Sequence, residues 1–181
     1  MSFLNVCDFL DAGEKSLKEK NYWSALTIAL MLPNICSRIE YMGNPDYLKR
    51  DGSIQDKKCY IDWCKKYLSE SSWINCTFRN DYPQILYALR CDIIHAGHAN
   101  ISNNEKEFIL SCGDENDDII FEKERIINIA VLCESMFSKV KLWHATSSKK
   151  DTLCTRVLNM ENKNDRQLLM EMFNKEHPKK L

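Results

Sequence analysis

Apolar residues recur at helical spacing along the first half of the chain, and this pattern predicts a set of amphipathic helices. A first helix is predicted from Phe3 to Leu17. A second begins after Asn21, which can cap it, and continues to Ile39. Because this second helix is apolar around much of its circumference, we expect it to be the central one, kinked or divided at Pro33.

Two further helices are predicted before residue 97. Ser53 and Asp56 resemble a capping box at the start of the third helix. Asp81 can cap the fourth helix, which has Pro83 in its first turn and Gly97 as its terminator. The apolar face of this fourth helix consists of Tyr82, Ile85, Leu86, Leu89 and Ile93.

The second half of the chain begins with two short runs rich in β-branched and aromatic residues, 108–112 and 118–121, on either side of the acidic segment 113–117. This pattern predicts a small β-hairpin with an acidic tip, inserted near residues 107–121. A strong helix is predicted to resume near Glu122. The expected fold class is therefore mainly α, a helical bundle with a small β-hairpin insertion.

The last part of the chain is more polar. Residues 145–151 include two serines and two lysines and predict a flexible connection, and residues 153–176 predict a more charged final helix. We therefore expect one helical domain over residues 1–145, followed by a linker and C-terminal helix over residues 146–181. The sequence leaves open whether this last part docks on the helical domain or reaches toward a partner.

Length and charge exclude some classes of function. The 181 residues carry 25 Lys and Arg against 26 Asp and Glu, and the net charge of −1 argues against a nucleic-acid binder of the histone type. No apolar run approaches the roughly 20 residues that span a bilayer. The N-terminus also lacks the basic start and apolar centre of a signal peptide. We expect a cytoplasmic protein with no membrane partner.

The nine cysteines are scattered singly. Because no C-x-x-C pair occurs, a zinc ribbon or a thioredoxin-type redox motif has little support. Four of the cysteines lie among apolar residues in helix-like stretches. These four are predicted to be reduced core thiols: Cys36, Cys59, Cys64 and Cys133.

Other candidate binding sites are weaker. Cys91, His95 and His98 suggest a metal site, but a fourth ligand is not evident. The acidic segment 114–118 lacks the twelve-residue loop of a helix–loop–helix calcium site, so a solvated turn is favoured. Tryptophan side chains can stack on nucleic-acid bases, but those within apolar helical stripes are predicted to be core. We therefore predict no metal and no cofactor.

The most pointed chemical feature is Arg90 followed by His95, near the end of the fourth predicted helix. A fixed cation beside a group that exchanges a proton near neutrality suits chemistry on phosphate esters. About 0.5 such spacings are expected by chance in this composition, so the pattern alone proves little. On an ideal helix the two residues lie about 140° apart around the axis and about 7.5 Å apart along it. We expect them to converge only if the helix loosens before Gly97 or if two copies meet in a two-fold dimer.

The segment from Leu89 to Gly97 resembles the motif of HEPN domains, small helical bundles whose signature is Arg, four to six residues, then His in a late helix. The resemblance extends over roughly residues 2–145, with the hairpin as an insertion. It implies a homodimer that assembles a metal-independent endoribonuclease site. It also implies a toxin, phage-defence or RNA-processing role, with RNA and an antitoxin or other protein as partners. Some members of this family have lost catalysis.

The resemblance implies a role for each site residue. His95 would act as general acid or base, Arg90 would hold the non-bridging phosphate oxygens, and Asp92 would orient one of the two. This chain has Cys91 where the family often has a polar residue directly after the arginine. It has Gly97 where one toxin subgroup carries a tyrosine that a partner enzyme modifies, so that form of control is not expected.

Two interpretations remain. The first is a homodimeric HEPN-type endoribonuclease. The second is a non-catalytic helical module for dimerisation or protein interaction. In the second, Arg90 pairs with an acidic neighbour and His95 only ends its helix, where a histidine interacts favourably with the helix dipole.

Overall fold

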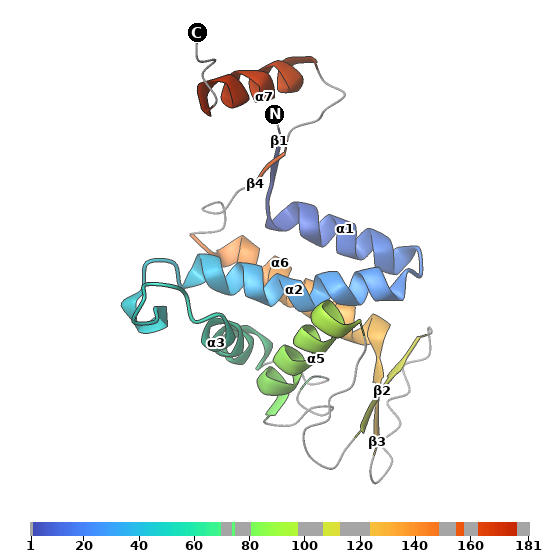
Figure 1. Cartoon of the computed structure of the whole chain (residues 1–181). Helices are drawn as coiled ribbons and strands as arrows, with labels where there is room; N and C mark the ends of the chain where they lie inside the picture. The colour runs from blue at the N-terminus through green and yellow to red at the C-terminus, as the bar shows by residue number, and fades with distance from the viewer. Residues whose placement is uncertain are drawn as a thin grey trace. The chain divides into compact units, whose positions relative to one another are not determined.

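The structure is a computed structural model that describes residues 2–69, 74, 81–97, 107–112, 124–148, 155–157 and 163–176. It is mainly helical, as predicted (Figure 1). By their contacts the residues divide into a larger unit, Val6–Lys150, and a smaller unit made of Met1–Asn5 and Asp151–Leu181. The larger unit contains α1 (Val6–Lys18), α2 (Tyr22–Glu40), η1 (Pro45–Tyr47), α3 (Asp56–Leu68), α5 (Tyr82–Ala96), β2 (Glu107–Ser111), β3 (Glu124–Asn128) and α6 (Ile129–Thr146).

Helix α2 is the central helix of the larger unit, which confirms the prediction from its apolar circumference. It packs against α1, α3, α5 and α6, and Figure 1 shows it between α1 and the pair formed by α3 and α5. Asn21 caps it as predicted, because its Oδ1 accepts a hydrogen bond from the Ser24 amide at 3.3 Å. Pro33 does not divide it. The helix is continuous to Glu40, since packing on several sides compensates for the hydrogen bond that proline removes.

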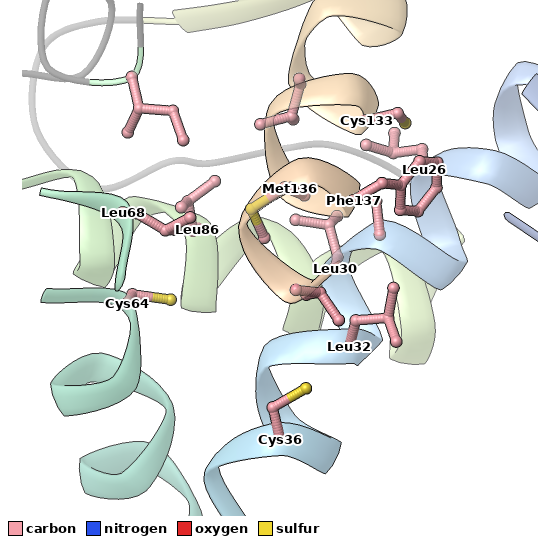
Figure 2. Close-up of a cluster of buried hydrophobic side chains, with 14 of the residues drawn as sticks. Leu26, Leu30, Leu32, Cys36, Cys64, Leu68, Leu86, Cys133, Met136 and Phe137 are labelled. Carbon is pink, nitrogen blue, oxygen red and sulfur yellow. The ribbon is translucent and has the colours of Figure 1, made fainter. Parts of the chain in front are cut away.

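The core of this unit forms where α2 meets its neighbours. Figure 2 shows Leu26, Leu30 and Leu32 of α2 beside Met136 and Phe137 of α6. Helix α1 approaches this cluster through Gly13. A Cβ atom at Gly13 would lie 2.6 Å from Cζ of Phe137, so with a larger residue there the Phe137 ring or the helix would have to shift. The four cysteines predicted to be core thiols are all buried and free.

The third helix begins differently from the prediction. Gln55 occupies the N-cap position of α3 and makes no capping hydrogen bond with its side chain. Ser53 instead donates from its amide and its hydroxyl to Oδ1 of Asp51, at 2.9 and 2.6 Å. The predicted capping box of Ser53 and Asp56 is therefore wrong, because a local Asp–Ser turn takes the serine away from the helix.

The first strand of the predicted β-hairpin is present as β2, but the strand that pairs with it in the described residues is one that the sequence did not predict. Strands β2 and β3 pair in parallel, with Ile109 opposite Ile126. Parallel strands need a longer crossover than a hairpin turn provides, and β3 begins only at Glu124, beyond the predicted second strand. The predicted second strand, residues 118–121, and the acidic tip, residues 113–117, lie outside the described residues.

Helix α6 starts later than predicted, because residues 124–128 are strand and the helix begins only at Ile129. A short β-branched run such as Ile126 and Ile127 fits strand and helix equally well by pattern alone. The change of structure occurs at Asn128. Its buried Oδ1 accepts hydrogen bonds from the amides of Ala130 and Val131, at 2.9 and 3.3 Å, and caps α6.

The smaller unit contains β1 (Ser2–Leu4), β4 (Thr155–Val157) and α7 (Lys163–Glu176). Strand β1 pairs antiparallel with β4, with Leu4 opposite Thr155. The first predicted helix therefore begins at Val6 rather than Phe3, and the final helix begins at Lys163 rather than near residue 153. No helix in the described parts of either unit combines the length and the apolar character needed to cross a membrane.

Candidate active site on helix α5

Helix α5 carries the three residues that the sequence singles out. Its first turn contains Pro83, and Asp81 stands at the N-cap without a capping hydrogen bond from its side chain. The helix ends at Gly97, as predicted. This glycine has a φ of 67°, in the left-handed region that favours glycine, and its amide donates to the carbonyl of Ile93 at 3.2 Å.

One face of α5 holds it against the core. The hydroxyl of Tyr82 donates to the carbonyl of Cys64 on α3 at 3.3 Å, and the ring of Tyr87 meets the ring of Tyr60 edge to face at 5.4 Å. Among the α5 side chains whose burial is described, the buried ones are Tyr82, Pro83, Leu86, Leu89 and Ile93. The buried face is thus the predicted apolar face, with Ile85 half-buried beside it.

Arg90 and His95 lie on different sides of this helix. His95 is exposed in the last turn, on the side opposite the buried face. Arg90 is half-buried and borders the core on the side of α3. The helix stays regular up to Ala96, so it does not loosen to bring the two together. In a single chain the guanidinium of Arg90 and the imidazole of His95 therefore point in different directions.

Arg90 has an unusual environment for a charged side chain. Its Nε is buried and has no hydrogen-bond partner, and its Nη1 makes only a 3.8 Å contact with Sγ of Cys91. No ion pair joins it to an acidic residue in the part of the chain that the structure describes. Burial raises the pKa of Tyr60 well above its usual range, and the positive charge of Arg90 opposes only part of that increase. The guanidinium thus has hydrogen-bonding capacity that no described partner uses, although its Nε is enclosed by the protein.

Asp92 is half-buried on α5. It lies three positions before His95, so the two are neighbours on the same side of the helix, and it lies away from Arg90. No hydrogen bond or ion pair connects Asp92 to either residue within the described ranges. Of the three predicted site residues, Asp92 and His95 are therefore adjacent and Arg90 is apart.

A second polar cluster, which the sequence did not predict, surrounds Glu40 at the end of α2. Its carboxylate accepts hydrogen bonds from Lys66 at 2.7 Å, from the Tyr67 hydroxyl at 3.1 Å and from Nε1 of Trp143 at 3.0 Å. Burial raises the pKa of Glu40, but the hydrogen bonds from Lys66, Trp143 and Tyr67 outweigh it, so the net pKa is lowered. These hydrogen bonds join α2, α3 and α6 to one another, and we call this cluster the clamp at the end of α2.

A thiol and an imidazole from opposite ends of the larger unit's sequence also lie in contact. Sγ of Cys7, in the first turn of α1, lies 3.5 Å from Nε2 and 3.7 Å from Nδ1 of His144, in the last turn of α6. Helix dipoles favour an anion at the first position and a cation at the second. Nothing in the local sequence signals this pair, because its members are separated by 137 positions.

The remaining predicted sites have mixed outcomes. His98 and the acidic segment 114–118 lie outside the described residues, as does Trp73. Within the described residues, no three His, Cys, Asp or Glu side chains are grouped so that they could hold a metal ion. Trp63 and Trp143 are fully buried in the core, whereas Trp23, in the first turn of α2, is 53% exposed.

Comparisons of the chain with models of protein families, with curated proteins and with solved structures found no match in any of the three. The function is therefore inferred from the residues of α5 and their surroundings.

Proposed function

We propose that the protein is a metal-independent endoribonuclease of HEPN type that acts as a homodimer, in a toxin or phage-defence role. One observation carries the proposal. Helix α5 holds an exposed histidine in its last turn and, one and a half turns earlier, a half-buried arginine whose Nε has no partner. Such a pair supplies a group for proton transfer and a fixed cation for phosphate.

The proposed chemistry uses the 2′-hydroxyl of RNA as nucleophile. His95 removes the proton from this hydroxyl or returns one to the leaving 5′-oxygen, and its exposure allows substrate to reach it. Arg90 donates hydrogen bonds to the non-bridging oxygens as negative charge builds up on the crowded phosphate. Asp92, as the neighbour of His95 on the helix, orients the imidazole.

The dimer is part of the proposal because one chain is insufficient. Arg90 and His95 of one copy face different directions, so a single phosphate is reached by both types of group only when two α5 helices meet. In a two-fold arrangement, His95 of one copy and Arg90 of the other share a cleft. Light scattering on the purified protein should therefore give a dimer mass in the active preparation.

The test is cleavage of a labelled RNA with and without a chelator, by wild type and by His95→Ala. We expect His95→Ala to lower the rate about a hundredfold or more, the usual contribution of a general acid or base, with no effect of the chelator on wild type. Arg90→Lys should lose most activity as well, because a lysine cannot hold two phosphate oxygens in the same fork. His144→Ala is the matched control and should cleave normally. Equal rates for wild type and His95→Ala would contradict the proposal.

The alternative is a non-catalytic dimerisation or protein-interaction module. The observation that favours it is the place of His95 in the last turn of α5, where interaction with the helix dipole accounts for a histidine without catalysis. This alternative predicts a dimer with no RNA cleavage. It also predicts that His95→Ala changes only stability, by less than about 1 kcal/mol.

A further inference from the structure

A basic groove of about 720 Å³ lies between α3 and α5. On the α3 side, Lys57, Ile61 and Lys65 recur every four residues and so share one face of the helix. On the α5 side, Gln84 and Tyr87 form the wall. We call this feature the lysine groove; its other lining residues are Lys49, Gln55, Asp56, Lys58 and Asp62.

The charges in the lysine groove are unequal. Four lysines line it against two aspartates, and both aspartates are already engaged. Asp56 forms an ion pair with Arg38 at 2.9 Å, and Asp62 accepts a hydrogen bond from the Tyr47 hydroxyl at 3.2 Å. Within the described parts of the chain, no ion pair involves any of the four lysines, and Lys58 donates a hydrogen bond to the carbonyl of Asp46 at 2.8 Å. The groove therefore keeps an excess of positive charge for an anion, although the net charge of the chain is −1.

An aromatic ring lies within this basic surface. Tyr87 is half-buried, and Nζ of Lys57 lies 5.9 Å from its ring centroid. A ring next to an ammonium group without an ion-pair partner is the combination that holds single-stranded nucleic acid, because the ring stacks on a base and the ammonium group contacts the phosphate. An acidic protein segment needs the cation but gains nothing comparable from the ring.

The lysine groove leads toward His95. Helices α3 and α5 run in opposite directions, since Tyr82 contacts the end of α3 at Cys64 whereas Tyr87 contacts Tyr60, nearer its start. Along α5, Gln84, Cys91 and His95 follow one another on the side away from the core, and Tyr87, which packs partly against the core, lies at the edge of this row; all four are exposed or half-buried. On an ideal helix His95 lies about 12 Å beyond Tyr87. A strand that passes from Lys65 to Lys57 therefore continues along α5 to the imidazole.

We propose that the lysine groove binds the backbone of single-stranded RNA and directs the strand along α5 to His95. The destination of the strand rests on the function proposed above, whereas the binding site stands on the charge, the ring and the shape of the groove. The lysines contact phosphates and Tyr87 stacks on a base, so binding tolerates different sequences and depends strongly on salt.

The experiment measures binding of a labelled single-stranded RNA by fluorescence anisotropy at several salt concentrations. It uses the full chain carrying His95→Ala, so that the RNA stays intact. The groove variant adds Lys57→Gln and Lys65→Gln. The matched control adds Lys15→Gln and Lys163→Gln, two exposed lysines outside the groove. Both variants change the net charge equally.

We expect the groove variant to bind more weakly and to flatten the plot of log affinity against log salt by about 1.4. Each phosphate contact on a single strand contributes about 0.7 to that slope. The control should keep the original slope. Tyr87→Ala should weaken binding about tenfold, whereas Tyr87→Phe, which keeps the ring, should not.

Two results would overturn this assignment. One is a groove variant whose affinity and salt slope match those of the control. The other is a groove variant that loses binding of labelled polyglutamate but binds RNA as before, which would assign the lysine groove to an acidic protein.

These experiments distinguish an error in the proposed RNA-binding role of the groove from an error in the proposed ribonuclease activity. If the lysines and Tyr87 govern RNA binding but wild type does not cleave RNA, the assignment of the groove is supported and the proposed ribonuclease activity is wrong. If cleavage depends on His95 while the groove variant binds and cleaves RNA like wild type, the ribonuclease activity is supported and the assignment of the groove is wrong.

Discussion

Helices α2 and α5 both contribute to the core of the larger unit, but they use their surfaces differently. Helix α2 is surrounded by four other helices, and its residues from Ala25 to Ile39 include seven apolar side chains with no exposed surface. Helix α5 buries one face only. Its opposite side, from Gln84 to His95, is open and lies next to the lysine groove.

The polar groups of the two helices differ in the same way. Glu40 at the end of α2 receives three hydrogen bonds from α3 and α6, so its charge is used within the fold. Arg90 of α5 has a buried Nε without a partner, and His95 projects from the last turn. A group whose interactions are complete stabilises the fold, whereas a cation with unused hydrogen-bonding capacity is a candidate for ligand binding.

The largest test of this contrast compares truncations on the two helices. Leu30→Ala in α2 should lower the free energy of unfolding by roughly 2–5 kcal/mol, because it leaves a cavity in the centre of the core. Gln84→Ala on the open side of α5 should change it by less than about 0.5 kcal/mol. Leu86→Ala, on the buried face of the same helix, should resemble Leu30→Ala. Urea unfolding of the three variants measures the difference, and similar losses for Gln84→Ala and Leu86→Ala would remove the contrast between the two sides of α5.

A smaller effect is expected from the clamp at the end of α2. Glu40→Ala should lower the free energy of unfolding by about 1–3 kcal/mol, since it leaves the indole N–H of Trp143 and the hydroxyl of Tyr67 without their acceptor. Glu134→Ala, an exposed glutamate on α6, is the matched control and should have little effect.

The clamp should also depend on pH, because the pKa of Glu40 is lowered in the folded protein. A carboxylate whose folded pKa lies below its unfolded value stabilises fully above the unfolded value, here the ordinary 4.5. This stabilisation is lost as pH falls through the lower folded pKa. The difference in stability between wild type and Glu40→Gln should therefore be constant from pH 6 to 7 and shrink below about pH 4.5. A difference that is unchanged at pH 3 would show that the charge of Glu40 does not take part.

The smallest effect is expected for the reactivity of two thiols, one on each helix. Cys36 of α2 is fully buried, and burial raises its pKa well above the usual range; Cys91 of α5 is half-buried on the open side. Alkylation of the native protein should therefore modify Cys91 about tenfold faster or more, because the reagent needs both access and thiolate. Mass spectrometry after a short exposure to iodoacetamide gives the ratio. The rates should become similar in urea, and similar rates without urea would mean that the core around α2 opens readily.

Much of the helical layout could be predicted from the sequence. The cap at Asn21, the central position of α2, the buried face of α5 and the stop at Gly97 all follow from patterns within a few residues, and the structure confirms them. The angular separation of Arg90 and His95 also follows from helix geometry alone. Local backbone preference and the helical repeat set these features, so no distant contact is needed to explain them.

The errors occurred where local signals were ambiguous. The run that contains Ile126 and Ile127 fits a helix by composition, yet it forms strand β3 because β2 pairs with it. Ser53 fits a helix cap by spacing, but its hydrogen bonds go to Asp51. In both cases two structures satisfied the same short pattern, and the contacts available in the folded chain decided between them.

By itself the sequence determined most of the helical segments, the apolar face of α5, and that an arginine and a histidine stand five positions apart on that helix. Only the tertiary structure decided what surrounds them. It placed α3 beside α5 and so made the lysine groove, it left Arg90 without an acidic partner among the described residues, and it joined Glu40 to Trp143 across 103 positions. The reason is physical: helical periodicity is a property of neighbouring residues, whereas a groove or a clamp depends on which surfaces meet when the apolar faces are buried together.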